Sequence, residues 1–382
     1  MKFLVLGGYG IIGRAVVDDL FKTCKDCEIV IAGRNLEKAE EYARSFNSKK
    51  VRAEKVDVNN IENISKVLKN SNVAVNCIQY YFNLNVMKAC LKARTNYVDL
   101  GGLFHMTKEQ LKLDKKFKKI GKTAILGIGA EPGISNILVA YGSKLLKRIE
   151  SVEITFGYND YIDHEQKFIL PYSFMTIIDE FTQKPAVFRN GKLTFVEPFS
   201  GEKQYDFNYN FGKQNIFYTL HSELLTLPNY LKDKGIKNFE FRANFPKDFV
   251  EKIKILIDVG FVSKEEIQTN AHKIKIIEGT STIMSRLVLK EDEKIKDEDI
   301  LRVDFNKGRL KLDVITESEG EISGGTLDTG SPCSIAAQMI ANRKIKEVGV
   351  FPPENIINPE EFLTELQKRK MKIMKNGKEV KL

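Results

Sequence analysis

Tryptophan is absent from the 382 residues of the chain, and histidine occurs at only four positions. The scarcity of histidine limits metal chemistry, because no two histidines stand at the spacing of metal ligands. We therefore expect no metal site. The same side chains are the available imidazole bases, and we expect His221, beside Ser222 and Glu223, to approach a cleft. The other three are His105, His164 and His272.

Cysteine is also rare, with five residues and no secretion signal. An odd and small number argues against a disulfide framework. Cys24 and Cys27 form one CxxC pair, but no second pair follows, so a zinc site is not favoured. Cys77, Cys90 and Cys333 lie in apolar contexts that are typical of core thiols.

The chain has no apolar run of the roughly 18 residues that a membrane helix requires. Residues 1–8, MKFLVLGG, are apolar but lack a small-residue cleavage site, so they predict a buried strand rather than a signal peptide. We therefore expect a cytoplasmic protein that does not bind membranes. A length of 382 residues exceeds one compact core and predicts two domains.

Charge of one sign is not concentrated anywhere in the sequence. Sixty basic and 51 acidic side chains give a net charge of +9, but the lysines are mixed with acids along the chain. No arginine-rich block or aromatic-interleaved basic patch is present, so we expect no nucleic-acid partner. An attraction for anionic small molecules stays open.

Residues 1–130 alternate between strand and helix patterns, which predicts a parallel sheet with helices on both faces, the Rossmann type of α/β fold. Strands are expected at residues 1–8, 28–33, 50–58, 73–78, 96–100 and 123–129. Helices are expected at residues 13–23, 36–46, 61–70, 84–94 and 109–121.

After Gly129 the pattern changes to several strands with few helices, which predicts a mixed α/β second domain. We expect a Rossmann domain over 1–130, a substrate and dimerisation domain over 131–330, and C-terminal helices over 331–382 that pack on the first domain. Strands are expected at 151–158, 186–190, 192–198, 239–245, 273–279, 281–290, 300–305 and 310–318. Helices are expected at 130–146, 222–231, 251–260 and 331–345, with a last helix within 351–370.

A glycine motif, GxGxxG, occupies Gly8 to Gly13 between the first strand and the first helix. This context is what dinucleotide binding requires. We expect Gly8 to allow the tight turn, Gly10 to let the pyrophosphate approach the backbone, and Gly13 to let the helix pack closely. The N–H groups of the loop would hold the phosphate. The intervening residues are Tyr9, Ile11 and Ile12.

The second strand, EIVIAG, ends without the Asp or Glu that usually binds the ribose 2′-hydroxyl of NAD. Arg34 and Asn35 follow instead, and a guanidinium suits a 2′-phosphate. We therefore expect NADP as the cofactor, with NAD possible if Arg34 lies on the adenine face. Asp57, after the third strand, is either a group near adenine or an ordinary turn aspartate.

Three stretches of the sequence resemble the saccharopine dehydrogenase family: residues 75–102, residues 127–142 and residues 331–354. The resemblance is strong over 1–145 and 330–370 and looser between. It implies a Rossmann domain joined to a mixed α/β domain. It also implies hydride transfer between NAD(P) and a C–N bond of an amino acid or polyamine. A saccharopine dehydrogenase-like reaction is the expected one. Lysine 6-dehydrogenation and carboxynorspermidine formation are the alternatives, and an NADP-binding sensor without turnover is another.

Residues near the ends of the fourth and fifth strands suit that chemistry. Cys77 and Ile78 are expected beside the nicotinamide ribose. Tyr80 would bind the substrate or relay a proton, unless it only packs, and Tyr81 would contact the substrate. Asp99 would stabilise positive charge on the substrate. The alternative for Asp99 is capping the turn at Gly101.

The start of the helix after Gly129 is the expected site for a substrate carboxylate, because its N–H groups are free in an isolated helix. The residues concerned are Glu131, Pro132, Gly133 and Asn136. Arg242 resembles an arginine with which some relatives hold a substrate carboxylate. The residues after it, Phe-Pro-Lys-Asp, depart from the Pro-Gly-His of those relatives. We also expect a homodimer that uses the second sheet.

Overall fold

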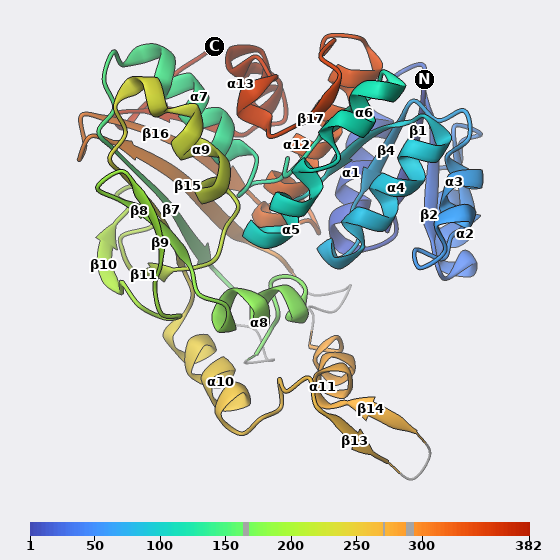
Figure 1. Cartoon of the computed structure of the whole chain (residues 1–382), viewed down its shortest axis with the longest axis horizontal. Coiled ribbons are helices and arrows are strands. Elements are labelled where there is room, and N and C mark those ends of the chain that lie inside the picture. Colours follow the sequence, from blue (N-terminus) through green and yellow to red (C-terminus); the bar gives the residue numbers. More distant parts are fainter. Residues whose placement is uncertain (163–167, 270–271, 288–293) are drawn as a thin grey trace.

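Two domains lie side by side in the computed structural model, the N-terminal one on the right of Figure 1 and the second on the left. The structure describes residues 1–162, 168–269, 272–287 and 294–382. Within these ranges, no helix is long and apolar enough to cross a membrane. His164 lies outside the described residues, so its role as a base stays a prediction.

The first domain is built on a sheet with the strand order β17-β6-β5-β4-β1-β2-β3, in which all neighbouring strands run parallel. The order reverses between β1 and β4, and ligands bind at the carboxyl ends of the strands beside such a point. The strands are β1 Lys2–Leu6, β2 Glu28–Gly33, β3 Val51–Lys55, β4 Val73–Asn76, β5 Asn96–Asp99 and β6 Thr123–Ile125. The helices are α1 Ile11–Thr23, α2 Leu36–Ser45, α3 Ile61–Leu68, η1 Tyr80–Phe82, α4 Asn83–Ala93, α5 Leu103–Leu111 and α6 Asp114–Ile120. The Rossmann prediction is confirmed.

The second domain has a mixed sheet with the order β10-β11-β12-β7-β15-β16-β18-β19, to which β8 and β9 attach through β12. Strands β7 and β12 pair in parallel, and their neighbours are antiparallel, which confirms the predicted mixed sheet. The strands include β7 Ser151–Asp160, β8 Ala186–Arg189, β9 Lys192–Phe195, β10 Lys203–Asp206, β11 Lys213–Tyr218, β12 Asn238–Asn244, β15 Asp297–Phe305 and β16 Leu310–Glu317. The helices are α7 Ile134–Leu145, α8 Phe174–Thr182, α9 Glu223–Tyr230, η2 Lys232–Lys234 and α10 Lys247–Asp258.

A small lobe hangs below the second domain in Figure 1, made of α10, the hairpin β13 Glu266–Gln268 with β14 Lys273–Lys275, and α11 Ile276–Met284. The predicted strands over 273–279 and 281–290 are wrong here, apart from β14; residues 288–290 lie outside the described part. A short apolar run is ambiguous between strand and helix. In α11, Ile277, Thr280 and Met284 are buried at a helical spacing.

The C-terminal segment is shared between both domains, which the sequence analysis did not anticipate. Helix α12 packs on α1 so closely that a Cβ on Gly330 would lie 2.7 Å from the Cβ of Ala15. Strand β17 pairs with β6 of the first sheet, whereas β18 pairs with β16 of the second. The elements are α12 Gly324–Ala341, β17 Gly349–Phe351, η3 Pro353–Asn355, α13 Pro359–Lys368, β18 Lys372–Lys375 and β19 Lys378–Glu379.

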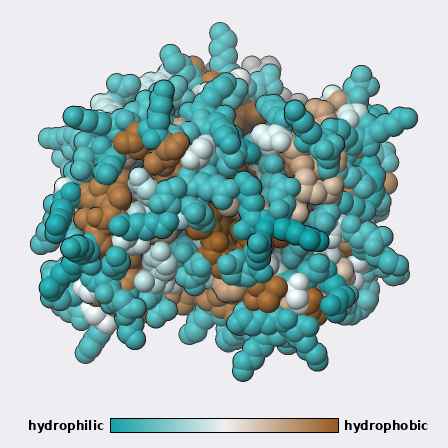
Figure 2. Space-filling model, turned by 90° about the horizontal axis from the view of Figure 1, so that it is seen from above, coloured by the Kyte–Doolittle hydropathy of each residue, from teal (hydrophilic) through white to brown (hydrophobic). Residues whose placement is uncertain are grey.

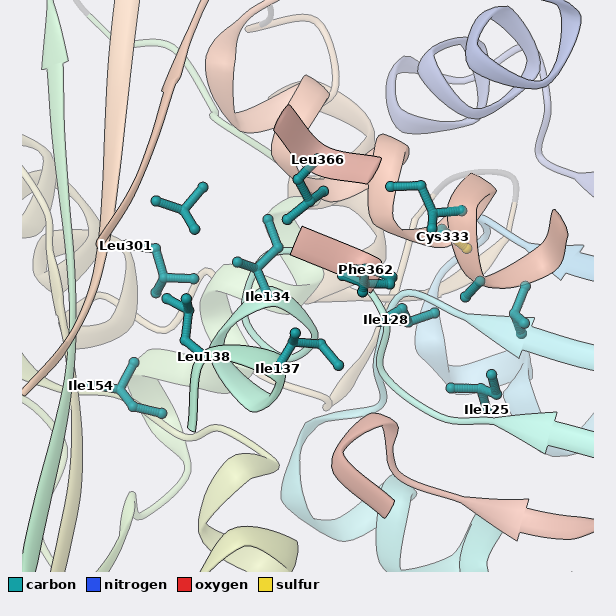
Figure 3. Packing of buried hydrophobic residues seen from close by; sticks show 14 of the residues in the cluster. Ile125, Ile128, Ile134, Ile137, Leu138, Ile154, Leu301, Cys333, Phe362 and Leu366 are labelled. Atoms are coloured by element: carbon teal, nitrogen blue, oxygen red, sulfur yellow. The ribbon is translucent and has the colours of Figure 1, made fainter. Parts of the chain in front are cut away.

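One apolar core runs from the first sheet into the second domain. Figure 3 shows helices α7, α12 and α13 meeting between the two sheets. The labelled side chains are Ile125, Ile128, Ile134, Ile137, Leu138, Ile154, Leu301, Cys333, Phe362 and Leu366. The face seen from above is mostly hydrophilic, with apolar patches scattered over it (Figure 2). The two domains therefore bury apolar surface against each other, and the helices between them fix the carboxyl edge of the first sheet.

Candidate active site

The loop between β1 and α1 holds the glycine motif and leaves no room for a side chain at Gly13. A Cβ at that position would lie 2.1 Å from the carbonyl oxygen of Gly7. The tight turn is made by Gly7, whose φ is 74°, and not by Gly8 as we expected. Gly10 is the N-cap of α1 and no side chain caps the helix, which leaves this N-terminus open to an anion.

The residues between the glycines shape the entrance to this loop. The Tyr9 ring covers Gly33, where a Cβ would come within 2.3 Å of it. Its hydroxyl accepts a hydrogen bond from the Asn35 N–H at 3.2 Å. Ile11 is exposed and Ile12 is partly buried at the start of α1. Tyr9 thus joins the phosphate loop to the residues after β2.

A surface cavity of about 590 Å³ opens beside the ends of β2 and β3. Its lining includes three cations, Arg34, Lys38 and Lys55, and no carboxylate. Among the described residues, none of the three forms an ion pair. These donors fit a 2′-phosphate, which takes charge-assisted hydrogen bonds. Arg34 lies where we expected it, whereas Lys38 and Lys55 were not predicted. Three further residues complete the lining: Tyr9, Asn35 and Leu36.

Asp57 serves the turn after β3. Its Oδ1 accepts hydrogen bonds from the Asn59 N–H at 3.0 Å and from the Asn59 side chain at 3.2 Å. Asn63 in turn accepts a hydrogen bond from the Asp57 N–H at 2.9 Å. These local contacts favour the ordinary turn aspartate over a group that binds adenine.

Cys77 and Ile78 follow β4 and pack on the glycine turn. A Cβ on Gly7 would lie 2.9 Å from Ile78 Cγ2 and 3.1 Å from the Cys77 carbonyl oxygen. Burial, together with a hydrogen bond to Cys77, raises the pKa of the Cys333 thiol on α12. Helix α12 therefore closes this end of the cofactor site, where the nicotinamide would lie.

Asp99 is a buried hub with donors on both oxygens. Oδ1 accepts from the N–H groups of Gly101 at 3.0 Å and Gly127 at 2.7 Å. Oδ2 accepts from the Tyr97 hydroxyl at 2.8 Å and from Gln110 at 2.6 Å. Burial raises the pKa of Asp99 in spite of these donors. The geometry favours the capping alternative, because no oxygen is left to face a substrate.

Tyr80 joins the two domains. Its hydroxyl donates to Asp179 Oδ2 on α8 at 2.6 Å, and its ring stacks on Tyr81 at 4.2 Å. Burial and the neighbouring Asp179 raise the pKa of Tyr80, so the phenol stays protonated at neutral pH. Tyr81 is 37% exposed at the same edge. Tyr80 thus acts as a hydrogen-bond donor across the domain boundary.

The turn before α7 is closed by its own residues. Pro132 wedges between two loops, since a Cβ on Gly127 would lie 2.7 Å from its ring. The N–H of Gly133 donates to Asn136 Oδ1 at 3.0 Å. The next two N–H groups, of Ile134 and Ser135, donate to backbone carbonyls at 2.9 and 3.1 Å. These donors are therefore not free for a substrate carboxylate, contrary to our expectation.

Arg242 lies on the side of β12 that faces away from this edge. Successive residues of a strand point to opposite faces, and the ring of the preceding residue, Phe241, stacks on His221 at 3.8 Å. The guanidinium pairs with Glu153 and with Glu240, the latter at 2.8 Å, and lies over the Tyr218 ring. The structure does not support a substrate-binding role for Arg242.

Five carboxyl groups from both domains form what we call the acidic cluster, and sequence reasoning found only Glu131 among them. Glu131 follows β6, and its Oε2 is buried without a hydrogen-bond partner. Burial and repulsion from Glu223, Asp299 and Glu180 raise the pKa of Glu131 well above its ordinary value. The members are Glu131, Glu180 on α8, Glu223 on α9, Asp299 on β15 and Asp328 on α12.

Polar groups of the second domain border the acidic cluster. His221 Nδ1 lies 3.6 Å from Glu223 Oε2. Burial disfavours the charged imidazole, but Glu223 and Glu180 outweigh it and raise the pKa of His221. Burial raises the pKa of Glu180 to about 7, although His221 and the Tyr172 hydroxyl oppose the shift. Glu180, whose pKa lies near neutral pH, is therefore one of the groups that act on Glu131.

The other two histidines in the described residues lie apart from this region. His105 on α5 lies near Phe195 of β9, with ring centroids 6.2 Å apart. His272 belongs to the β13–β14 hairpin in the small lobe. Of the imidazoles we considered, His221 is thus the one that reaches the cluster, as we expected from its neighbours.

Comparison with known proteins identifies both halves of this architecture. The family model described as the saccharopine dehydrogenase NADP binding domain matches residues 3–125, and that of the saccharopine dehydrogenase C-terminal domain matches residues 129–371. Carboxyaminopropylagmatine dehydrogenase from Synechocystis is 24% identical, over 96% of this chain and 95% of its own length. Carboxynorspermidine synthase from Vibrio cholerae is 25% identical, over 63% of this chain and 62% of its own length.

Solved structures share the fold at low identity. Saccharopine dehydrogenase (L-Glu forming) from Saccharomyces cerevisiae superposes with a TM-score of 0.73 and 17% identity, covering 99% of each chain. Homospermidine synthase from Legionella pneumophila in complex with NAD gives a TM-score of 0.71 and 14% identity, covering 98% of this chain and 90% of that one. The first domain is therefore an NADP-binding domain, and the chain belongs to the saccharopine dehydrogenase family of oxidoreductases.

Proposed function

We propose that this protein is an NADP(H)-dependent oxidoreductase that makes or breaks a C–N bond in a polyamine-type substrate. The acidic cluster carries the proposal, because buried carboxylates without partners are stable only when protonated or paired with a cation. A dicarboxylic substrate such as saccharopine needs cationic partners, and Arg242 is already paired with Glu153 and Glu240. The names of the relatives, carboxyaminopropylagmatine dehydrogenase and carboxynorspermidine synthase, point the same way.

Each side chain near the cluster has a distinct part in this proposal. The unpartnered Glu131 Oε2 accepts a hydrogen bond from the substrate nitrogen and stabilises positive charge on it. Glu180, with its pKa raised by burial to about 7, holds or releases a proton there. When bound, NADP(H) supplies or accepts the hydride. Tyr80 and Asp179 keep the domains together over this reaction.

The phosphate-binding cavity supports NADP over NAD. Arg34, Lys38 and Lys55 offer cations to a 2′-phosphate, and the lining holds no carboxylate for a 2′-hydroxyl. The loop glycines and the open N-terminus of α1 suit the pyrophosphate of either cofactor. The residues at the end of β2 therefore determine the preference for NADP over NAD, whereas the residues around Glu131 determine which substrate reacts.

The test is a nicotinamide absorbance assay with a small substrate panel. NADPH is offered with a diamine and an amino-acid semialdehyde, and NADP⁺ is offered with saccharopine or with lysine. We expect oxidation of NADPH with the diamine pair and no reaction with saccharopine. Turnover of saccharopine alone would overturn the polyamine proposal. Tight NADPH binding without any turnover would favour the sensor alternative.

A Glu131→Gln variant tests the residue at the centre of the proposal. Removing the charge should lower kcat/KM for the amine by about 100-fold, since a charged hydrogen bond to a reacting group is worth about 3 kcal/mol. The Kd for NADPH should stay unchanged. Glu266→Gln, at an exposed position of the small lobe, is the matched control. Undiminished turnover by Glu131→Gln would remove this carboxylate from the mechanism.

We also propose a homodimer and a cytoplasmic location, both from the sequence. A dimer that uses the second sheet would bury an edge or face of it. Light scattering in solution measures the mass directly, and a mass near 43.5 kDa would contradict the dimer.

A further inference from the structure

Two members of the acidic cluster, Asp299 and Asp328, meet at the start of α12. Alternate residues of β15 point inward, and Phe305 on this face packs against α7, where a Cβ on Gly142 would lie 2.3 Å from its ring. Asp299 shares that face, and its Oδ2 would be 3.0 Å from a Cβ on Gly325. Because Gly324 and Gly325 at the start of α12 have no side chains, this carboxyl group can approach the helix.

Asp299 is buried without a donor. It is 2% exposed, and neither of its oxygens has a hydrogen-bond partner. The Asp328 carboxyl, 3% exposed, lies nearby, and Asp299 contributes to the raised pKa of Asp328. Two buried carboxyl groups so near to each other favour the state in which one of them holds a proton. The pair is thus a buried anionic group with acceptor oxygens that lack hydrogen-bond donors.

Within the described residues, the charged neighbours that shift the pKa values of the pair are acids. Burial raises the pKa of Asp299, and the nearby Asp297 and Glu298 raise it further. Burial, Asp299 and Glu131 likewise raise the pKa of Asp328. From β7, the Tyr158 phenol also faces this region. Every charged neighbour that shifts these two groups therefore works against a second negative charge.

The pair also lies beside the edge of the first sheet. Thr329, the residue after Asp328, packs on the loop after β6, where a Cβ on Gly129 would lie 3.2 Å from Thr329 Cγ2 and 3.4 Å from the Leu100 carbonyl oxygen. Glu131 stands two residues after Gly129. Glu131 thus lies near the pair, and it contributes to the raised pKa of Asp328.

We propose that Asp299 and Asp328 bind a second ammonium group of the substrate, remote from the nitrogen that reacts near Glu131. The proposal rests on the proposed function and adds residues that select a diamine over a monoamine. Binding is non-covalent: the ammonium donates to a pair of which one member holds a proton in the free protein, and that proton is released to solvent. Diamine binding is thus accompanied by the release of one proton more than monoamine binding, in which only the carboxyl group of Glu131 is engaged.

Calorimetric titration of the protein with NADPH bound tests this, using 1,3-diaminopropane and 1-aminopropane as probes. Each is titrated in two buffers of different ionisation enthalpy at pH 7. We expect the diamine to bind about 30-fold more tightly than the monoamine, the scale of a charged hydrogen bond. We also expect buffer-dependent heats that report the release of about one more proton per diamine than per monoamine. Equal affinities would overturn the proposal.

Asp299→Asn and Asp328→Asn, each tested separately, keep the shape of the pair and remove its charge. We expect each to weaken diamine binding by about 30-fold and to remove the additional proton release of the diamine, with a smaller effect on monoamine binding. Asp304→Asn is the control, since this residue lies on the opposite side of the same strand and accepts from the Gly308 N–H. An equal loss for both amines would show a purely structural pair.

Steady-state assays separate this inference from the proposed function. If NADPH is not oxidised with any amine and carbonyl pair, the proposed function fails, whatever the titrations show. If 1-aminopropane and 1,3-diaminopropane react with the same KM, the function stands and the role of Asp299 and Asp328 falls. A KM increase for the diamine alone in Asp328→Asn supports both.

Discussion

The cavity beside Arg34 and the acidic cluster around Glu131 differ in charge, in burial and in how the chain builds them. The cations come from neighbouring elements of the first domain and stay in contact with water, so they cost little free energy in the free protein. The carboxyl groups come from both domains and are buried, so they cost free energy until a proton or a cation joins them. The first region is thus ready for an anion, and the second, in our proposal, exchanges its protons for an amine.

The largest effect that we expect concerns the cofactor side of this comparison. In Gly13→Ala, the new methyl group would overlap the Gly7 carbonyl oxygen and push α1 away from the loop. NADPH binding should weaken by about 100-fold or more, because overpacking of this kind costs up to about 3 kcal/mol. Fluorescence titration with NADPH measures the loss. Gly279→Ala in α11 is the control, as its nearest neighbour is an ordinary 3.5 Å away, and matching affinities in both variants would contradict the prediction.

Glu354, a buried acid that interacts with Glu223 of the acidic cluster, allows the cost of burying a carboxylate to be measured through the stability of the protein. Burial raises its pKa to about 7, from an ordinary value of 4.5. The folded state therefore holds a proton that the unfolded chain has lost, and stability falls as pH rises from about 4.5 to 7. Glu354→Gln should raise the free energy of unfolding at pH 8 by up to about 3 kcal/mol and leave it unchanged at pH 4. Urea unfolding at both pH values measures this.

The exposed Glu321→Gln is the control for that experiment, and it should show no pH-dependent difference. A Glu354→Gln variant that is less stable than the parent at both pH values would show that the carboxyl group acts as a necessary hydrogen-bond partner of Asn136. The free-energy cost of burying the Glu354 carboxylate would then be smaller than the stabilisation from its hydrogen bond.

Arg34→Ala should have the next largest effect, on cofactor choice. Loss of a charge-assisted hydrogen bond should raise the KM for NADPH by about 30-fold and change the KM for NADH little. Steady-state kinetics with both cofactors measure the ratio. Arg309→Ala, at an exposed turn of the second domain, is the matched control. A parent enzyme with equal kinetics for the two cofactors would contradict the assignment of the cavity.

Asp57→Asn should have the smallest effect. The amide keeps an oxygen for the Asn59 donors, so the turn should persist. NADPH affinity should stay within about twofold of the parent, as for surface changes that remove no special contact. A tenfold loss in a binding titration would instead place Asp57 beside the adenine and extend the cofactor site beyond the cavity.

The parts of this molecule that could be predicted from the sequence are those governed by neighbours in the chain. The alternation of strands and helices, the loop at Gly13 and the cation at Arg34 all follow from local patterns. One local boundary was wrong: the helix expected at residues 331–345 begins at Gly324 and continues through Pro332. A proline costs one hydrogen bond, and the packing of α12 on α1 compensates for it.

The acidic cluster was mostly missed because its members are far apart in the sequence. Asp299 has one local signal. It lies on the same face of β15 as the buried Leu301 and Val303, and a carboxylate on a buried face is unusual. Glu180 sits in an apolar helix for which no periodic pattern was recognised. Only the fold brings these groups to Glu131. The substrate-binding role expected for Arg242 came from the resemblance to the family. That resemblance did not reveal that Glu153 and Glu240 already pair with this side chain.

The position of β17 has a consequence for synthesis of the protein. The strand completes the first sheet, yet its residues, Gly349–Phe351, are made long after β6, which it pairs with. At a ribosomal rate of about 5–20 residues per second, roughly 10–40 seconds pass between the two. During that time β6 is an open sheet edge and the face of α1 that receives α12 is bare. The nascent first domain thus presents a binding surface to chaperones until the last tenth of the chain emerges.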